Sequence, residues 1–230
     1  MVLTTADVAK MLDLSCVRMH HTADDIHKMV NAAKEYRCGQ VSVLQCYIGL
    51  TKELLKGDKD IHVVGNISFP SGSDITELKV FHAKQMVKAK CDEVDMVMNI
   101  NFLKSGMYRE VEEDVKAVRK AVGNIPMKVI IESPILDKEL IKKACEICMN
   151  AKATFVKTGT GWTEPTTLEQ VQYIKSIVGD NIFIKASGGV KNLDLLAEMY
   201  RAGARRFGVN LRGGISLLEE CKARGGSIEI

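Results

Sequence analysis

The sequence has no long apolar run, no basic block and no histidine cluster, and each absence excludes a class of protein. No apolar stretch approaches the roughly 18 residues that cross a bilayer, and no basic segment with an apolar signal core opens the chain. The 32 basic and 29 acidic residues are spread along the chain, without the basic stripe and interleaved aromatics of nucleic-acid binders. We therefore expect a cytoplasmic protein that binds neither membranes nor nucleic acid.

The histidines and cysteines also lack the spacing of metal or disulfide sites. The cysteines number seven, and the one CxxC pair, Cys145 and Cys148, lies late in a helical pattern, whereas a redox pair belongs at a helix start. We expect reduced, buried thiols, no metal site and no cofactor. The five histidines, none of them at ligand spacing, are His20, His21, His27, His62 and His82.

What the sequence does contain is a regular alternation of short strand patterns and amphipathic helix patterns, which is typical of parallel β-α-β units. Several strand patterns are nearly continuous in apolar residues, as in strands buried on both faces. The chain of 230 residues is long enough for one barrel, which needs roughly 200 to 250. The eight expected strands cover residues 12–15, 40–44, 62–69, 93–100, 127–133, 154–158, 182–186 and 206–210.

The segments between the strands carry helix start signals, namely Thr22 or Asp24, Ser73 and Asp137, and residues 50–55 form a further short helix. No linker or shift in composition divides residues 1–230, so we expect one domain. Eight such units predict an α/β fold, a single-domain (β/α)8 TIM barrel. The rival is an open doubly wound sheet, but no GxGxxG follows a strand.

Three charged residues interrupt the predicted strands. Asp95 lies in an otherwise buried strand, and Lys157 and Lys185 lie in two consecutive strands, each followed by small and glycine residues. In a barrel the two lysines would point into one small volume, where like charge and desolvation lower an amine pKa and make it a nucleophile. A nearby carboxylate could then move protons. The alternative is a purely structural network of buried ion pairs.

Several motifs occur in the order and spacing of a known family: DEVDMVMNINFLKSG, KVIIES, FVKTGTG, IKASGGV and AGARRFG. Together they resemble the deoxyribose-phosphate aldolases over nearly the whole chain. The resemblance implies a metal-independent class I aldolase that cleaves 2-deoxyribose 5-phosphate to acetaldehyde and glyceraldehyde 3-phosphate, or joins them. It makes Lys157 the Schiff-base nucleophile, with Lys185 lowering its pKa, Asp95 acting with a water as acid and base, and Asp13 supporting the proton network.

The resemblance also implies a phosphate site at the glycine turns after the last strands, which Gly161, Gly188 and Gly189 fit. Tight turns need positive φ whatever the ligand, so the same glycines have a purely structural explanation. The last-strand turn departs from the family, because GVNLRGG replaces its serine-containing sequence. Arg212 in this turn could bind a phosphate or a carboxylate through two hydrogen bonds, or it could form a surface ion pair.

Further departures alter the expected substrate pocket. Ser42 takes the place of the usual cysteine, KTGTG with Thr160 replaces KTSTG, and Trp162 and Asn210 are additional changes. A divergent aldolase acting on another sugar phosphate or acidic carbonyl compound therefore remains open, as does a non-catalytic binding barrel. A metal-dependent class II aldolase lacks its clustered histidines here. The expected partner is a small phosphorylated or anionic carbonyl substrate, and we expect a homo-oligomer, a dimer.

Overall fold

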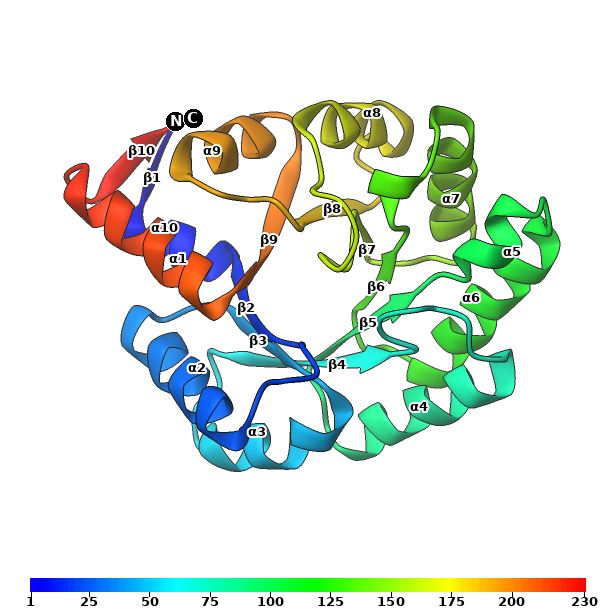
Figure 1. Cartoon of the computed structure of the whole chain (residues 1–230), viewed down its shortest axis with the longest axis horizontal. Coiled ribbons are helices and arrows are strands. Elements are labelled where there is room, and N and C mark those ends of the chain that lie inside the picture. The colour runs from blue at the N-terminus through cyan, green and yellow to red at the C-terminus, as the bar shows by residue number, and fades with distance from the viewer.

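Eight parallel strands close into one barrel in the computed structural model, which describes residues 1–230. Each strand is hydrogen-bonded to the next along the chain, and the last pairs with the first, as the sequence predicts. The fold is therefore the predicted single-domain (β/α)8 barrel (Figure 1). The barrel strands are β2 (Leu12–Cys16), β3 (Gln40–Val43), β4 (His62–Ile67), β5 (Glu93–Val97), β6 (Met127–Ile130), β7 (Phe155–Lys157), β8 (Phe183–Ser187) and β9 (Ala204–Asn210).

Helices follow every barrel strand and form the outer ring in Figure 1. None of them combines the length and the apolar character needed to cross a bilayer. The helices are α1 (Thr5–Met11), α2 (Ala23–Tyr36), α3 (Ile48–Leu54), α4 (Thr76–Lys88), α5 (Ile100–Lys104), α6 (Tyr108–Val122), α7 (Lys138–Asn150), α8 (Leu168–Val178), α9 (Leu193–Arg201) and α10 (Leu211–Ala223), with short 3-10 turns at Gln45–Tyr47 and Ser133–Ile135.

Three predicted strands are too long at their carboxyl ends. The strands predicted for residues 62–69, 93–100 and 127–133 end at Ile67, Val97 and Ile130. Ser68 and Glu132 have φ of 56° and 51°, which no strand accommodates. The apolar pattern continues past these strand ends because the following loops are themselves buried, so hydrophobicity alone misplaced the boundaries.

Two of the predicted helix starts are confirmed and one is wrong. The side chains of Thr22 and Asp137 accept hydrogen bonds from the third residue of α2 and α7. Ser73 caps nothing, because α4 begins only at Thr76, with Ile75 at the N-cap and no side-chain cap bond. The hydroxyl of Ser73 is instead within 2.9 Å of the Ser71 hydroxyl, in a local turn.

The two ends of the chain form a small sheet that the sequence pattern did not reveal. Strands β1 (Val2–Thr4) and β10 (Ser227–Glu229) pair antiparallel, and the amino group of Met1 donates to the carbonyl of Ile230 at 2.8 Å. Figure 1 shows the two termini side by side. A pairing of three-residue strands 220 or more residues apart leaves no local periodicity, which explains why it escaped prediction.

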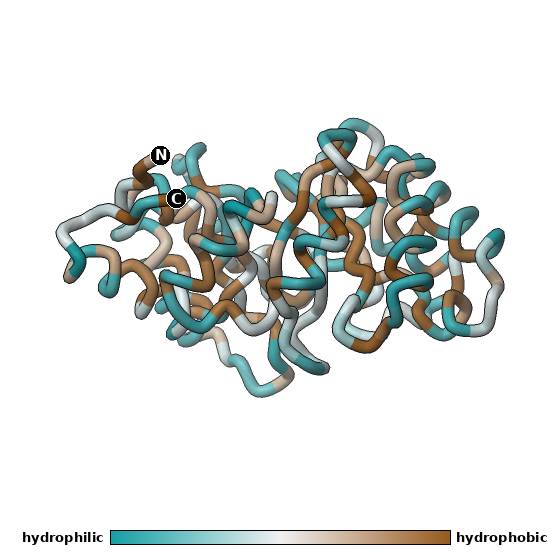
Figure 2. Tube along the Cα trace, turned by 90° about the horizontal axis from the view of Figure 1, so that it is seen from above, coloured by the Kyte–Doolittle hydropathy of each residue, from teal (hydrophilic) through white to brown (hydrophobic).

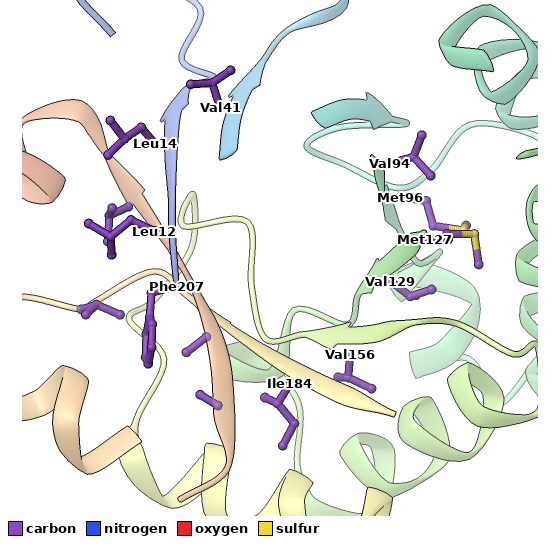
Figure 3. Close-up of a cluster of buried hydrophobic side chains, with 14 of the residues drawn as sticks. Leu12, Leu14, Val41, Val94, Met96, Met127, Val129, Val156, Ile184 and Phe207 are labelled. Carbon is purple, nitrogen blue, oxygen red and sulfur yellow. The ribbon is translucent and has the colours of Figure 1, made fainter. Parts of the chain in front are cut away.

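Side chains alternate along the barrel strands between an apolar outer face and a polar interior. The outward residues of β5 are Val94 and Met96, and they pack toward the helix layer (Figure 3), whereas Asp95 between them points inward. Figure 2 shows hydrophilic residues along the outer helix turns. The predicted burial of Cys145 and Cys148 is confirmed, and desolvation raises the pKa of the Cys145 thiol to about 12.

Candidate active site

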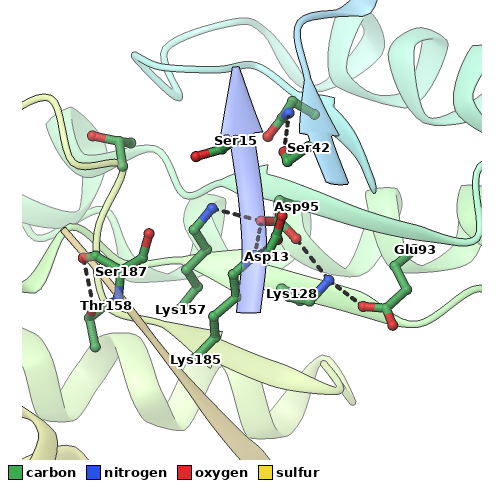
Figure 4. A network of polar contacts seen from close by, with 12 residues as sticks. Asp13, Ser15, Ser42, Glu93, Asp95, Lys128, Lys157, Thr158, Lys185 and Ser187 are labelled. Atoms are coloured by element: carbon green, nitrogen blue, oxygen red, sulfur yellow. Dashed lines mark hydrogen bonds and ion pairs between the residues drawn. The ribbon is translucent and has the colours of Figure 1, made fainter. Parts of the chain in front are cut away.

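The strand register brings charged residues into one layer of the barrel interior. Lys157 on β7 is the register partner of Lys185 on β8, and Asp95 on β5 is the partner of Lys128 on β6. Because partner residues in neighbouring strands share a face, each pair projects into the barrel together. The structure thus brings together the two predicted lysines and the predicted aspartate, as Figure 4 shows.

These side chains form a closely connected ionic cluster. The Lys157 Nζ donates to Asp95 Oδ2 at 2.7 Å, and the Lys185 Nζ lies 3.0 Å from the same oxygen. Lys185 also donates to Asp13, the predicted supporting residue. Asp13, Asp95 and Lys185 are fully buried, and Lys157 is 6% exposed. Of the cluster described so far, Lys157 therefore has the best access for a ligand.

The two lysines differ in how many carboxylates they contact. Desolvation lowers the pKa of Lys157, and the positive charge of Lys185 lowers it further against the opposing effect of Asp95. Lys185 is desolvated too, but contact with Asp13 and Asp95 raises its pKa above the ordinary value. The expected lowering of an amine pKa by burial and like charge thus holds for Lys157, whereas it is wrong for Lys185, where the two carboxylates outweigh desolvation. Lys157 is the amine that deprotonates more readily.

We expect the substitution Lys185→Met to move the pH profile of imine formation to higher pH. A lysine that forms an imine reacts as the free amine, so with Lys157 in that role we expect the rate to rise with pH through its pKa, which desolvation lowers from the ordinary value. Removing Lys185 removes a like charge and leaves Asp95 to hold the Lys157 proton, so the pKa of Lys157 rises. The measurement is the rate of borohydride trapping with acetaldehyde as a function of pH.

The matched control for this variant is Lys79→Met. Lys79 is a fully buried lysine that contacts Asp114 at 2.7 Å between α4 and α6, outside the barrel interior. We expect this variant to keep the wild-type inflection. An unchanged or acid-shifted inflection in Lys185→Met would contradict the electrostatic role of Lys185.

Sequence reasoning missed two members of the cluster, Lys128 and Glu93. The Lys128 Nζ forms ion pairs with Glu93 and, at 3.0 Å, with Asp95 Oδ1, so both oxygens of Asp95 contact lysines. Lys128 holds the pKa of Asp95 well below its usual range, against desolvation, together with the other two lysines. Glu93 lies two residues before Asp95 on β5, so strand alternation places both on the inner face, and this spacing was an available signal; the register of Lys128 with Asp95 comes only from the structure.

Two adjoining cavities lie at the carboxyl ends of the strands. The outer cavity has a volume of about 730 Å³ and is lined by most of the predicted anion-site and pocket residues. The inner one, of about 20 Å³, contains Lys157 and Lys185 and has room for roughly one water. The predicted residues on the outer cavity are Thr160, Gly161, Gly188, Gly189, Asn210 and Arg212.

The glycine turns approach each other closely at the outer cavity. Gly161 and Gly188 have φ of 74° and 85°, and a Cβ on Gly188 would lie 3.2 Å from the Gly161 Cα. A Cβ on Gly189 would lie only 2.8 Å from Pro165. The close packing of these turns therefore requires glycine whether or not an anion binds.

The other predicted pocket residues have different places. Ser42 lines the inner cavity and accepts a hydrogen bond from the Asn66 amide at 3.0 Å. The Asn210 side chain caps α10 by accepting from the Gly213 N–H at 2.8 Å. Trp162 lines neither cavity. The centroid of its ring lies 6.2 Å from that of Phe69, and the guanidinium of Arg18 covers the ring. Its influence on a substrate would pass through those two side chains, which do line the cavities.

A buried carboxylate that the sequence did not single out, Glu132, holds the loop after β7. It accepts hydrogen bonds from the Thr160 N–H at 3.1 Å and from the Thr163 hydroxyl at 2.8 Å. Glu132 is itself in the left-handed conformation, next to the end of β6. No group of three or more metal-ligating side chains is assembled anywhere in the chain.

The closed parallel barrel and its buried lysine cluster define a (β/α)8-barrel enzyme. The chain belongs to the DeoC/LacD family of aldolases, whose family model matches residues 8–223, so it is a carbon–carbon lyase. It is 42% identical over 219 residues to a deoxyribose-phosphate aldolase of Thermoanaerobacter sp. (strain X514), with 93% of this chain and 96% of the relative covered. The corresponding enzyme of Staphylococcus carnosus is 41% identical over 214 residues, with the same coverage.

Solved structures agree with this assignment. The chain superposes on QR15, an aldolase, with a TM-score of 0.89 and 36% identity, covering 95% of this chain and 97% of that one. A tetrameric deoxyribose phosphate aldolase from Aeropyrum pernix gives a TM-score of 0.84 at 25% identity, with 96% and 93% covered. The family resemblance carried by the sequence motifs is confirmed.

Proposed function

We propose that this aldolase cleaves 2-deoxyribose 5-phosphate to acetaldehyde and glyceraldehyde 3-phosphate, and catalyses the reverse addition, through a Schiff base on Lys157. The observation that carries the proposal is the buried Lys157 amine, at the inner cavity and 2.7 Å from Asp95. The names of the relatives support the choice of substrate.

The reaction begins with attack of the neutral Lys157 amine on the aldehyde carbon C1 of the sugar. Loss of water gives a protonated imine, which withdraws electrons from the C2–C3 bond. A base removes the proton from the C3 hydroxyl, the C2–C3 bond breaks, and glyceraldehyde 3-phosphate leaves. The electron pair of the broken bond remains as an enamine on Lys157.

The second half of the reaction returns the enzyme to its starting state. The enamine takes up a proton at C2, and water hydrolyses the resulting imine to acetaldehyde and the free Lys157 amine. We assign the proton transfers to Asp95 together with a water in the inner cavity. Lys185, like Lys157, lines this cavity and contacts Asp95, and it keeps its own proton because two carboxylates contact it.

The phosphate would lie in the outer cavity, at the turns of Gly161, Gly188 and Gly189. Arg212, without a carboxylate partner in the structure, supplies a positive charge to the same cavity. We further propose that the protein is cytoplasmic and that it forms a homo-oligomer, a dimer; the tetrameric Aeropyrum pernix neighbour supports self-association but not the number of subunits.

The test is reductive trapping with borohydride in the presence of 2-deoxyribose 5-phosphate, followed by peptide mapping. We expect one adduct, on Lys157, and acetaldehyde release in the absence of borohydride. An adduct with acetaldehyde but no cleavage of the sugar phosphate would retain the aldolase and reject this substrate. Absence of any adduct on folded protein would reject the Schiff base.

A further inference from the structure

Arg18, in the loop between β2 and α2, is a half-buried arginine that lines the outer cavity and has no carboxylate partner. Its guanidinium donates one hydrogen bond, from Nη2 to the carbonyl of Gly161, and stacks over Trp162 with 4.8 Å between its carbon and the ring centroid. A guanidinium has five N–H donors, so most of its capacity is unused in this position.

Both sides of this contact are held in place. The backbone of Arg18 is fixed by the turn it forms with His21, in which the Arg18 N–H donates to the imidazole at 3.1 Å. The backbone N–H of Trp162 donates to the Thr160 hydroxyl at 3.0 Å, and Glu132 accepts from the backbone N–H of Thr160 in the same loop. The guanidinium is therefore presented to the cavity in a prepared position, which lowers the entropic cost of binding a ligand.

The cavity around Arg18 has an excess of positive charge. Its permanent cations are Arg18 and Arg212, and its one carboxylate, Asp25, is engaged by the N–H and hydroxyl of Thr22 at 2.7 and 2.9 Å. An anionic ligand would neutralise this excess of positive charge in the outer cavity. The neutral Gly161 carbonyl is a weaker acceptor for a guanidinium than a phosphate oxygen, because a charge-assisted hydrogen bond is roughly twice as strong.

Gly161 connects Arg18 to the turns that would hold the substrate's far end. The guanidinium is bonded to the carbonyl of a residue that itself contacts Gly188. We propose that Arg18 is a specificity-determining residue that binds the phosphate end of the substrate and selects phosphorylated over neutral sugars. This inference rests on the proposed function. It adds Arg18, from the loop after β2, to the proposed phosphate site at the glycine turns after β7 and β8.

The first test compares kcat/KM for 2-deoxyribose 5-phosphate and for unphosphorylated 2-deoxyribose in Arg18→Met, which keeps an apolar stem over Trp162. We expect a loss of about 10- to 100-fold with the phosphorylated sugar, mainly in KM, as expected for a hydrogen bond between charged groups. The neutral sugar and the trapping of acetaldehyde on Lys157 should change little. Arg18→Lys should recover part of the loss.

The matched control is Arg205→Met. Arg205 also stacks on an aromatic ring, 4.4 Å from the centroid of Tyr200, and donates to the backbone carbonyl of Tyr200 at 2.9 Å, but it lines neither cavity. We expect wild-type values for both sugars. Two results for Arg18→Met would overturn the proposal. An equal loss of kcat/KM for both sugars would indicate a purely structural role for Arg18, and an unchanged kcat/KM for both would show that Arg18 does not bind the phosphate.

A second test needs no turnover. Trp162 is the single tryptophan and lies against the guanidinium, so its fluorescence reports whether Arg18 moves. We expect inorganic phosphate to change this fluorescence in the wild type and in Arg205→Met. Calorimetric titration of phosphate, which does not depend on Arg18 as a reporter, should show binding at least about 10-fold weaker to Arg18→Met. Equal phosphate affinity in all three proteins would overturn the role of Arg18 even if 2-deoxyribose 5-phosphate proves not to be the substrate.

Discussion

Replacing Lys157 by arginine is expected to abolish imine formation while the protein stays folded. Arginine retains the positive charge beside Asp95 but remains protonated, so it cannot attack a carbonyl carbon. We expect kcat for cleavage of 2-deoxyribose 5-phosphate to fall at least about 1,000-fold, a scale typical for loss of a covalent nucleophile. The measurements are steady-state cleavage and borohydride trapping with acetaldehyde, in which the adduct should disappear.

The matched control for this variant is Lys79→Arg. Lys79 is buried and paired with Asp114 as Lys157 is with Asp95, but it lies between two helices of the outer ring. We expect trapping and turnover at the wild-type level. Trapping at an unchanged rate in Lys157→Arg would show that another lysine is the nucleophile, with Lys185 the first to test.

The substitution Asp95→Asn is expected to impair both turnover and stability. Asp95 is fully buried and contacts Lys128, Lys157 and Lys185, so a neutral amide leaves three lysines without their shared counter-charge. Breaking a buried ion pair on one side costs about 3 to 5 kcal/mol of the free energy of unfolding. Loss of the acid and base function lowers kcat by about 100- to 10,000-fold. Urea denaturation and steady-state kinetics measure the two effects.

Asp114→Asn separates the two effects of the Asp95 substitution. Asp114 is a buried carboxylate that pairs with Lys79 and accepts from the Thr76 hydroxyl at 2.9 Å, away from both cavities. We expect a comparable loss of stability with kcat unchanged in the folded fraction. If Asp95→Asn also kept its kcat, Asp95 would serve only to hold the lysines in place.

The distribution of carboxylates distinguishes Lys157 from the other two lysines of the cluster. Glu93 pairs with Lys128, Asp13 pairs with Lys185, and Asp95 is shared among all three lysines. Lys157 has no carboxylate of its own and lies at the cavity. Of the two lysines at the inner cavity it is therefore the one whose proton is held less firmly, because no second carboxylate contacts it.

The sequence by itself determined the fold class and the main members of the site. Alternating strand and helix patterns are local signals, and eight of them leave few ways to bury every apolar face other than a closed barrel. Asp95, Lys157 and Lys185 were visible because a charge in a buried strand is costly and needs a partner. The family motifs then implied the roles that we propose for these residues, which the residue types alone left open.

Only the tertiary structure decided how the charges are paired and which loops meet. The different pKa values of Lys157 and Lys185 depend on Asp13, which lies 172 residues from Lys185 along the chain. The contact of Arg18 with Gly161, 143 residues apart, is equally invisible to local patterns. Electrostatic interaction depends on distances in space and on burial, and both arise only when the barrel closes and brings β2 against β9.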